Sequence, residues 1–170
     1  RGRNIDGDPR QDGVQLSEVV FYDDTQQRLS VVLAESPGVE PYNPSQAPMQ
    51  AVDANYETKW YDRMLKGNTP RNATLVVRFA QPTLVAAFEI FTAGESRSGA
   101  INMERDPTAF IFGIILPDGT KHAMREWTEV TPPDTRKTSY TTTYGQIFDI
   151  FTTPPPLPPV SPPHPSPPFG

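Results

Sequence analysis

The sequence contains no cysteine among its 170 residues. This absence excludes a disulfide framework, a thiolate zinc site and a cysteine nucleophile. Histidine is nearly as scarce, because His122 and His164 are the only two. His164 stands among prolines with no carboxylate near it in sequence, so a Ser-His-Asp triad would depend on His122. We expect His122 to be an ordinary half-exposed side chain of a strand.

Positive charge and long apolar runs are also lacking. The chain has 15 Lys and Arg against 20 Asp and Glu, which gives a net charge of −5. A nucleic-acid-binding domain normally carries a basic patch, and this composition does not favour one. The best apolar stretch, residues 73–90, is interrupted by charged residues and a proline, so it falls short of the ~18 residues of a membrane span. We expect neither nucleic-acid binding nor direct membrane insertion.

The residues that are present divide the chain into three parts. Residues 1–13 are polar and turn-rich, and we expect an extended N-terminal arm. Residues 14–151 hold most of the apolar residues, which make up 36% of the chain and suit one domain with a core. Residues 152–170 are dominated by proline. The first residue is Arg1 rather than Met, and we expect the chain to be a processed piece of a longer protein.

Short runs of β-branched and aromatic residues, separated by turn signals, follow one another through the middle part. Apolar and polar residues alternate clearly at residues 73–79 and 84–90, as in half-buried strands. Residues 110–116 form a continuous apolar run, which predicts a fully buried strand. Residues 36–48 hold several prolines and must be loop. About eight strands, from residues 14–22 at the start to residues 139–144 and 146–151 at the end, and the absence of a helical period predict an all-β fold, an antiparallel β-sandwich.

The stretch at residues 51–60 interleaves Asp53, Asn55 and Thr58 and closes on Trp60. Asp and Asn side chains bond back to their own backbone, which favours a compact turn with carbonyls pointing inward. Together with the Asp53 carboxylate and the Thr58 hydroxyl, these carbonyls would form the all-oxygen cage that Ca²⁺ prefers, with ligands at about 2.3–2.6 Å. The alternative is an Asx turn without an ion, in which Trp60 is simply a core residue.

The motif D-A-N-x-x-T-x-W at residues 53–60 resembles the D-G-N-x-x-T-x-W loop of discoidin domains. These are also called coagulation factor 5/8 type C domains, and related galactose-binding-like carbohydrate modules share the loop. Residues 14–23 resemble the opening strand of the family, and residues 105–113 resemble its Asp-Pro segment before a central strand. The resemblance covers residues 14–151 and implies a jelly-roll-like sandwich with functional loops at one end.

Two departures from the family pattern bear on the metal site. Ala54 stands where the family has Gly, and Ala resists the positive φ of such a turn. Calcium-binding members add a Glu from the last strand, and here that strand offers Asp149 instead. The resemblance therefore implies Ca²⁺ as the candidate cofactor, held by Asp53, Asn55, Thr58 and Asp149.

Aromatic and planar polar side chains in the predicted loops suit a sugar ligand. Sugars are gripped by an aromatic platform beneath an apolar face and by polar groups around the hydroxyls. The candidates of this kind are Tyr42, Tyr56, Tyr61, Arg63, Arg97 and Asn102. Tyrosines that only pack on the edge of the sandwich are the alternative. A glycoside hydrolase with paired carboxylates stays open, although nothing singles out two among Glu18, Glu57, Asp62 and Glu104.

The last segment, residues 152–170, holds 10 of the 21 prolines of the chain. It lacks most N–H donors and cannot join a sheet, so we expect a polyproline II stalk. Its Ser-Pro-Pro and Pro-Pro-Pro runs resemble hydroxyproline-rich cell-wall glycoproteins of green algae and plants. This resemblance implies hydroxylated, glycosylated prolines, and the N-glycosylation triplet at Asn72 adds a further acceptor. The candidate glycosylation positions are Asn72, Pro155, Pro156, Pro159, Pro163 and Pro168. A bare linker or a ligand for an SH3-like groove is the alternative.

These patterns together predict a non-catalytic subunit of an extracellular or cell-surface glycoprotein assembly, such as a filament or wall layer. Its partners would be a glycan or polysaccharide and further copies of the same chain, linked by the proline-rich tail. The alternative is a carbohydrate-binding module joined by a proline-rich linker to a secreted enzyme. What the tail contacts distinguishes the two.

Overall fold

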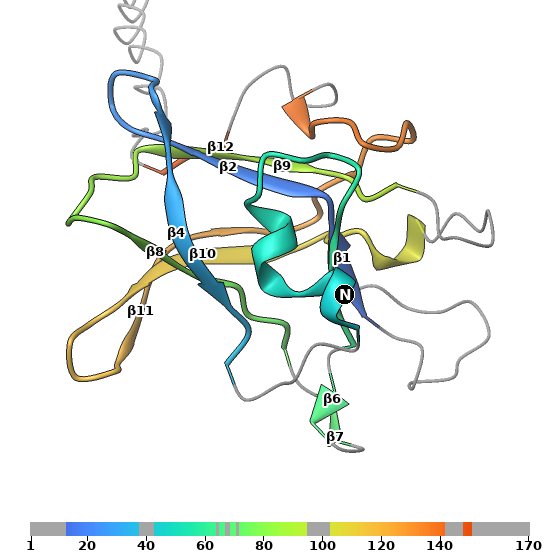
Figure 1. The fold of residues 1–170 in the computed structure, drawn as a ribbon, viewed down its shortest axis with the longest axis horizontal. Coiled ribbons are helices and arrows are strands. Elements are labelled where there is room, and N and C mark those ends of the chain that lie inside the picture. Colours follow the sequence, from blue (N-terminus) through green and yellow to red (C-terminus); the bar gives the residue numbers. More distant parts are fainter. Residues whose placement is uncertain are drawn as a thin grey trace, which may run out of the picture.

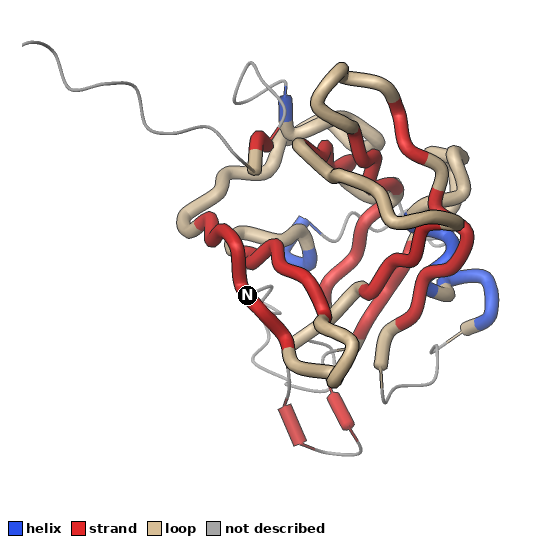
Figure 2. The backbone as a smooth tube through the Cα atoms, turned by 90° about the vertical axis from the view of Figure 1, so that its left-hand side faces the viewer, coloured by secondary structure: helices blue, strands red, loops and turns tan. Residues whose placement is uncertain are grey.

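Short antiparallel strands build the molecule, as Figure 1 shows for a computed structural model of the chain. The structure describes residues 13–37, 43–63, 65–66, 69–70, 72–94, 103–141 and 148–150. The predicted stalk at residues 152–170 and the predicted arm at residues 1–13, apart from Gly13, lie outside these ranges. Helix is a minor part of the described chain, as Figure 2 shows, and includes three short 3₁₀ turns: η1 (Pro44–Gln46), η2 (Pro48–Ala51) and η3 (Met103–Arg105). The described chain is therefore all-β, as predicted.

The largest sheet has four strands in the order β12-β9-β2-β3. Its strands are β2 (Glu18–Tyr22), β3 (Arg28–Leu29), β9 (Ala87–Phe91) and β12 (Phe148–Asp149). The other strands form antiparallel pairs: β1 (Val14–Leu16) with β5 (Trp60–Asp62), β4 (Val31–Glu35) with β8 (Val76–Phe79), β6 (Leu65–Lys66) with β7 (Thr69–Pro70), and β10 (Phe110–Ile115) with β11 (Lys121–Trp127). The antiparallel arrangement was predicted, but the strands are shorter and more numerous than expected.

Two predicted strands differ from the structure. The first, expected to begin at Val14 and run without a break, divides at Ser17 into β1 and β2, which belong to different sheets. Ser17 is buried, and its Oγ donates to the carbonyl of Thr92 at 2.9 Å, so the chain bends there to satisfy a polar group inside the core. A strand was also predicted at residues 139–144. Its described part makes only an isolated bridge between Ser139 and Phe91.

The proline-rich loop at residues 36–48 is more ordered than expected in its described part. Pro44 and Pro48 each begin a 3₁₀ turn, where a fixed φ is already suitable. The side chain of Asn43 caps the first turn by accepting from the N–H of Ser45 at 2.9 Å. These turns lead the chain into the stretch at residues 51–60.

The core is largely aromatic around Phe88 of β9. Its ring lies 5.2 to 5.8 Å from the rings of Phe110, Phe112, Trp127 and Phe148, which belong to β10, β11 and β12. The same buried cluster includes Trp60, which is 4% exposed. The prediction that Trp60 is a core residue beneath the loop is confirmed.

The prediction of a fully buried strand at residues 110–116 is wrong. Only one face of β10 is covered, since Phe110 and Phe112 pack into the core while Ile111 is 62% exposed. β10 and β11 form a hairpin that pairs with no third described strand, and Ile111 and Ile115 on its outer face are exposed. Periodicity cannot report this difference, because an apolar run has the same pattern whether one face or both are covered.

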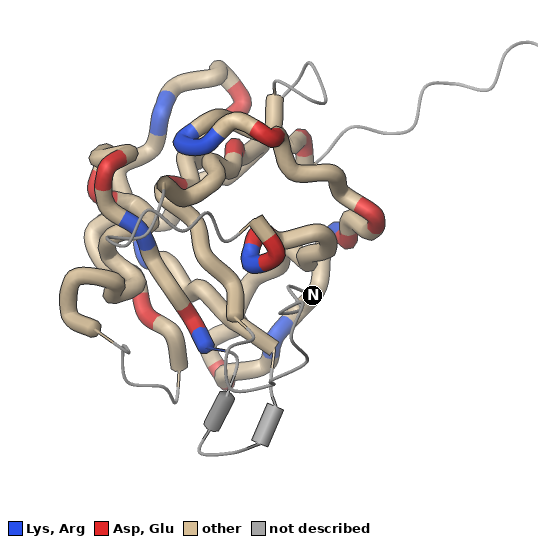
Figure 3. The backbone as a smooth tube through the Cα atoms, turned by 90° about the vertical axis from the view of Figure 1, so that its right-hand side faces the viewer, with Lys and Arg blue, Asp and Glu red and all other residues tan. Residues whose placement is uncertain are grey.

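Charged residues of both signs occur throughout the described chain, with acidic residues in excess. Acidic and basic positions are interspersed along the backbone in Figure 3. Among the described residues, no helix has the length and apolar character to cross a membrane.

Candidate functional site

Two overlapping side-chain turns shape the loop after η2. The N–H of Asn55 donates to Oδ1 of Asp53 at 2.9 Å, and the N–H of Glu57 donates to Oδ1 of Asn55 at 3.1 Å. The N–H of Thr58 then donates to the carbonyl of Asn55 at 3.1 Å. Asx turns of this kind compete with helix and strand, which explains why the chain forms a tight loop between η2 and β5.

An oxygen cluster forms inside this loop around the hydroxyl of Thr58. Its Oγ1 lies 3.0 and 2.9 Å from the two carboxylate oxygens of Asp53, 2.7 Å from the carbonyl of Asn55 and 3.3 Å from the carbonyl of Gln50. A hydroxyl carries one proton, so it donates to one of these four acceptors at a time. Oxygens that share one calcium ion at about 2.3–2.6 Å lie roughly 3 Å from one another. The spacing of the oxygens suits a bound cation, although Oδ1 of Asp53 and the carbonyl of Asn55 each also accept a backbone N–H.

Ala54 occupies the position where a glycine would fit best. Its φ is 62°, in the left-handed region that Gly adopts readily and Ala does not. The strained residue is held by a long-range contact, because its N–H donates to Oε1 of Glu18 at 3.1 Å. Strand β2 therefore fixes the loop from outside.

Glu18 is a buried carboxylate with one oxygen left unpartnered. Its residue exposure is 0%, and its Oε1 accepts from Ala54 and from the Arg28 guanidinium at 3.1 Å. Its Oε2 is buried without a hydrogen-bond partner. Burial raises the pKa of Glu18 to about 7, and the Asp53 carboxylate adds to the shift, while the Ala54 N–H and Arg28 oppose it. A second cation beside Oε2 would offset the free energy that is lost when the Glu18 carboxylate is buried.

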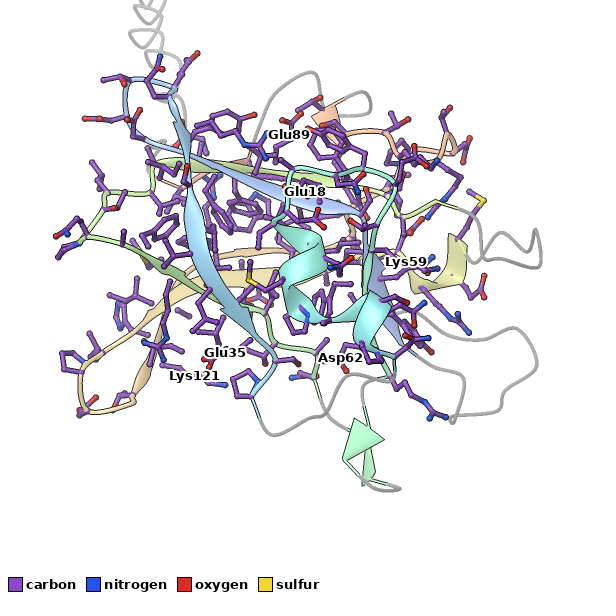
Figure 4. The ribbon with its side chains drawn as sticks, viewed as in Figure 1. Glu18, Glu35, Lys59, Asp62, Glu89 and Lys121 are labelled. Carbon is purple, nitrogen blue, oxygen red and sulfur yellow. The ribbon has the colours of Figure 1, made fainter. Side chains whose placement is uncertain are left out.

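A small cavity lies beside this carboxylate. It has a volume of about 180 Å³ and is lined by Glu18, Arg28, Asp53 and Ala54, among other residues of β2, β3 and the loop. Figure 4 shows Glu18 beside η2 and the loop that follows it. Small-molecule sites usually measure about 300–1,000 Å³, so this cavity suits an ion with its water rather than a sugar ring.

Asp149 does not join the cluster. In the four-stranded sheet Glu18 pairs with Phe91 of β9, whereas Asp149 pairs with Ala87 at the other end of the same strand. Four residues along a strand span roughly 13 Å. Of the predicted ligands, the structure brings together Asp53, Asn55 and Thr58, with Asn55 contributing its carbonyl.

Glu18 is the residue that the sequence interpretation did not assign to the metal site. It had been named only among carboxylates free to pair for hydrolysis. The available signal was its place in β2, where a single charged residue precedes the apolar run of Val19, Val20 and Phe21. A charge that is built into a buried strand is rarely without a partner or a function.

The predicted sugar-binding residues are dispersed or outside the described ranges. Tyr56 packs against Phe91 at a ring distance of 4.7 Å. Tyr61 is buried in β5, and the Arg105 guanidinium lies 4.8 Å above its ring. Arg63 directly follows β5 and is partly exposed. Tyr42, Arg97 and Asn102 lie outside the described residues.

The predicted glycosylation positions are placed only in part. Asn72 is exposed and precedes β8 by a few residues. The prolines at 155, 156, 159, 163 and 168 fall outside the described ranges.

The four carboxylates that might serve hydrolysis do not form an open pair in the structure. Glu57 forms an ion pair with Lys137, and Asp62 is buried and accepts from the hydroxyl of Ser36 at 2.8 Å. Glu18 is enclosed beside the loop, and Glu104 lies in η3. Among the described residues, no group of three or more His, Cys, Asp or Glu side chains converges as a metal cluster. An ion at the loop would therefore rely on carbonyl and hydroxyl oxygens in addition to Asp53 and Glu18.

No protein-family model, curated protein or solved structure matches this chain. Function must therefore be argued from the geometry of the molecule itself.

Proposed function

We propose that the chain is a non-catalytic calcium-binding subunit of an extracellular or cell-surface glycoprotein assembly, built on a jelly-roll-like β-sandwich. The observation that carries the proposal is the oxygen cluster at Thr58, in which four acceptors surround a single hydroxyl proton. The unpartnered oxygen of Glu18, next to the same loop, adds a second argument for a cation.

The donor set suits calcium in particular. It consists of hard oxygens, with the carboxylates of Asp53 and Glu18, the hydroxyl of Thr58 and the carbonyls of Asn55 and Gln50 within or beside the loop. Calcium accepts irregular sets of six to eight such ligands, whereas magnesium demands a near-ideal octahedron. When bound, the ion would neutralise two close carboxylates and hold the loop on β2. Its role would be structural.

The extracellular setting is supported by the sequence. Calcium modules of the extracellular space bind with dissociation constants of about 10⁻⁴–10⁻³ M, and we take this range for the proposed site. The exposed Asn72 of an N-glycosylation triplet and the proline-rich tail favour a secreted glycoprotein. In this proposal the tail links neighbouring copies of the chain, and the assembled copies bind a glycan or polysaccharide.

The test is thermal unfolding of the intact chain in calcium or in chelator. With about 10 mM calcium and a dissociation constant of 10⁻⁴–10⁻³ M, binding to the folded state should add about 1.4–2.7 kcal/mol to the free energy of unfolding. Magnesium at the same concentration should have a much smaller effect. Asp53→Ala should abolish the calcium response. Identical melting curves in calcium and chelator would show an ion-free Asx turn.

The glycoprotein part of the proposal is tested separately, by measuring the mass of the native chain. The unmodified chain has a mass of 18.9 kDa, and protein isolated from its natural source should be heavier by attached sugar. An unmodified native mass would overturn the glycoprotein part of the proposal and leave the calcium part standing.

A further inference from the structure

Exposed apolar side chains gather on one hairpin of the molecule. Nine large hydrophobic residues are exposed among the described residues, and five of them belong to the β10–β11 segment: Ile111, Ile114, Ile115, Leu116 and Met124. Single exposed hydrophobic residues are normal, but a cluster of this kind usually marks an interaction surface. The hairpin is therefore the strongest candidate for a contact with another molecule.

The two faces of the hairpin have different surroundings. Phe110, Phe112 and Trp127 pack against Phe88 in the aromatic core, so the inner face anchors the hairpin to the domain. Ile111 and Ile115, which are 62% and 47% exposed, lie an even number of residues apart on β10 and share the outer face. A strand that is apolar on both faces is typical of sheets covered on both sides. In the described chain, no other element covers the outer face of β10.

The outer face carries small residues at its middle and charged residues opposite its isoleucines. Between Ile111 and Ile115 the cross-strand pair is Gly113 with Ala123, so the middle of the face carries little side-chain bulk, while Glu126 and Lys121 pair with Ile111 and Ile115. A side chain at Gly113 is excluded, because its Cβ would lie 2.4 Å from the carbonyl oxygen of His122. Among the described strands, neither β10 nor β11 pairs with a third strand, so both are edge strands.

A polyproline II rod is the ligand that fits this surface. Such rods dock on apolar grooves, and their carbonyls have no internal partners and accept bonds from neighbours. The chain carries a segment with the composition of such a rod in residues 152–170, with 10 prolines and with Leu157, Val160 and Phe169 as apolar residues. Extended at about 3.1 Å per residue, this segment spans roughly 60 Å, against roughly 20 Å for β10.

The place where the tail begins decides which copy it reaches. Arg125 of β11 donates to the carbonyl of Asp149, one residue before the end of the described chain, and its guanidinium lies 5.1 Å over the ring of Trp127. The described chain therefore ends on the inner side of its own hairpin. To reach its own outer face, a stiff rod would have to reverse around the edge of the hairpin. The outer face of another copy needs no such reversal.

We propose that the outer face of the β10–β11 hairpin is the docking surface for the proline-rich tail, residues 152–170, of a neighbouring copy. The inference rests on the proposed assembly through the tail and names the surface that receives it. The contact is heterologous, since the tail of one copy meets the hairpin of the next, and it repeats into a chain or ring. Each copy uses one tail and one hairpin.

The experiment uses two full-length variants and their mixture. The hairpin variant carries Ile111→Ser and Ile115→Ser, and the tail variant carries Leu157→Ser, Val160→Ser and Phe169→Ser. Light scattering after gel filtration should show assemblies for the wild-type chain and monomers for each variant alone. An equimolar mixture should give a 1:1 complex, because the intact tail of the hairpin variant meets the intact hairpin of the tail variant. Both variants should melt within a few degrees of wild type, since the changed side chains are exposed.

The matched control is Val32→Ser, which removes a hydrophobic side chain that is 56% exposed on β4, away from the hairpin. This variant should assemble as wild type does. A hairpin variant that still assembles, while the tail variant does not, would overturn the docking surface and leave the tail-linked assembly standing. A tail variant that assembles while the hairpin variant is monomeric would mean that two hairpins meet each other instead.

Two further outcomes also contradict the inference. If the mixture of monomeric variants gives no complex, the tail of one copy does not dock on the hairpin of the next, and the inference fails. If the wild-type chain is monomeric up to about millimolar concentration, where a contact of about 4 kcal/mol would be half formed, both this inference and the proposed assembly fail.

Discussion

The backbone N–H of Ala54 donates to Oε1 of Glu18 across 3.1 Å, although the two residues are 36 positions apart. The contact joins the strained turn of the loop to a buried strand. It also leaves the second oxygen of Glu18 beside the cavity without a partner. This pair explains how a loop with weak local preferences acquires a defined geometry, and it leads to the first prediction.

Glu18 should make the calcium-free protein less stable as the pH rises. In the folded chain the pKa of Glu18 is raised from 4.5 to about 7, so the unfolded chain releases its proton first. The stabilising contribution of this group is complete below pH 4.5 and declines to pH 7, by at most roughly 3 kcal/mol. Urea unfolding in chelator at pH 4.5–8 measures the decline.

Glu18→Gln provides the comparison, because it keeps the acceptor for Ala54 and cannot ionise. Its stability should lack this decline and should also lose the response to calcium above pH 7. Parallel pH profiles for the wild type and the variant would contradict the prediction.

Thr58→Val should remove most of the calcium response while keeping the shape of the side chain. The substitution deletes the hydroxyl at the centre of the oxygen cluster and costs about 1 kcal/mol in chelator. Calcium-dependent melting should shift by less than half of the wild-type shift.

Thr25→Val is the matched control for that measurement. Thr25 donates its hydroxyl to Oδ1 of Asp23 at 2.7 Å in an exposed Asx turn. This turn is not part of the oxygen cluster around Thr58, so the variant should lose similar stability and keep the full calcium response. Equal responses in the two variants would argue against a role for Thr58 in binding.

Ala54→Gly should stabilise the protein by about 0.5–1 kcal/mol. The left-handed conformation at φ 62° costs an alanine about 1–2 kcal/mol, and the extra freedom of glycine in the unfolded chain offsets part of the gain. The same change at Ala47, whose φ is −66°, should instead destabilise by about 0.5–1 kcal/mol. Chemical denaturation of the two variants checks the opposite signs. If both variants lose stability, the left-handed conformation at residue 54 does not strain alanine in the folded chain.

Arg136→Ala should be among the most damaging substitutions in the chain. Arg136 pairs through both terminal nitrogens with Asp106, whose exposed fraction is 1%, and its Nε donates to the carbonyl of Ala93 at 2.7 Å. Removal leaves a buried carboxylate without its cation, which costs about 3–5 kcal/mol. Thermal or urea unfolding measures the loss.

The neighbouring Lys137→Ala serves as its control. Lys137 pairs with Glu57 at the surface, and such pairs contribute about 0–1 kcal/mol. If the two variants are equally stable, the pair of Arg136 with Asp106 contributes no more to stability than a surface ion pair does.

The sequence by itself determined the fold class and the location of the oxygen-rich loop. Alternation at residues 73–79 and the absence of helical periods were sufficient for antiparallel strands, because side-chain direction in a strand has a period of two. The spacing of Asp53, Asn55 and Thr58 was sufficient for the turn, because these side chains bond to the backbone within a few residues. Trp60 was also placed correctly in the core.

Only the tertiary structure decided which distant groups complete each site. Asp149 was expected at the loop, yet strand register places it at the far end of β9 and brings Glu18 to Ala54 instead. The exposed outer face of Ile111 depends on whether another layer covers the hairpin. Register and layer packing are contacts between segments far apart in the chain. Local preferences carry no information about them, because every strand obeys the same period whatever lies against its two faces.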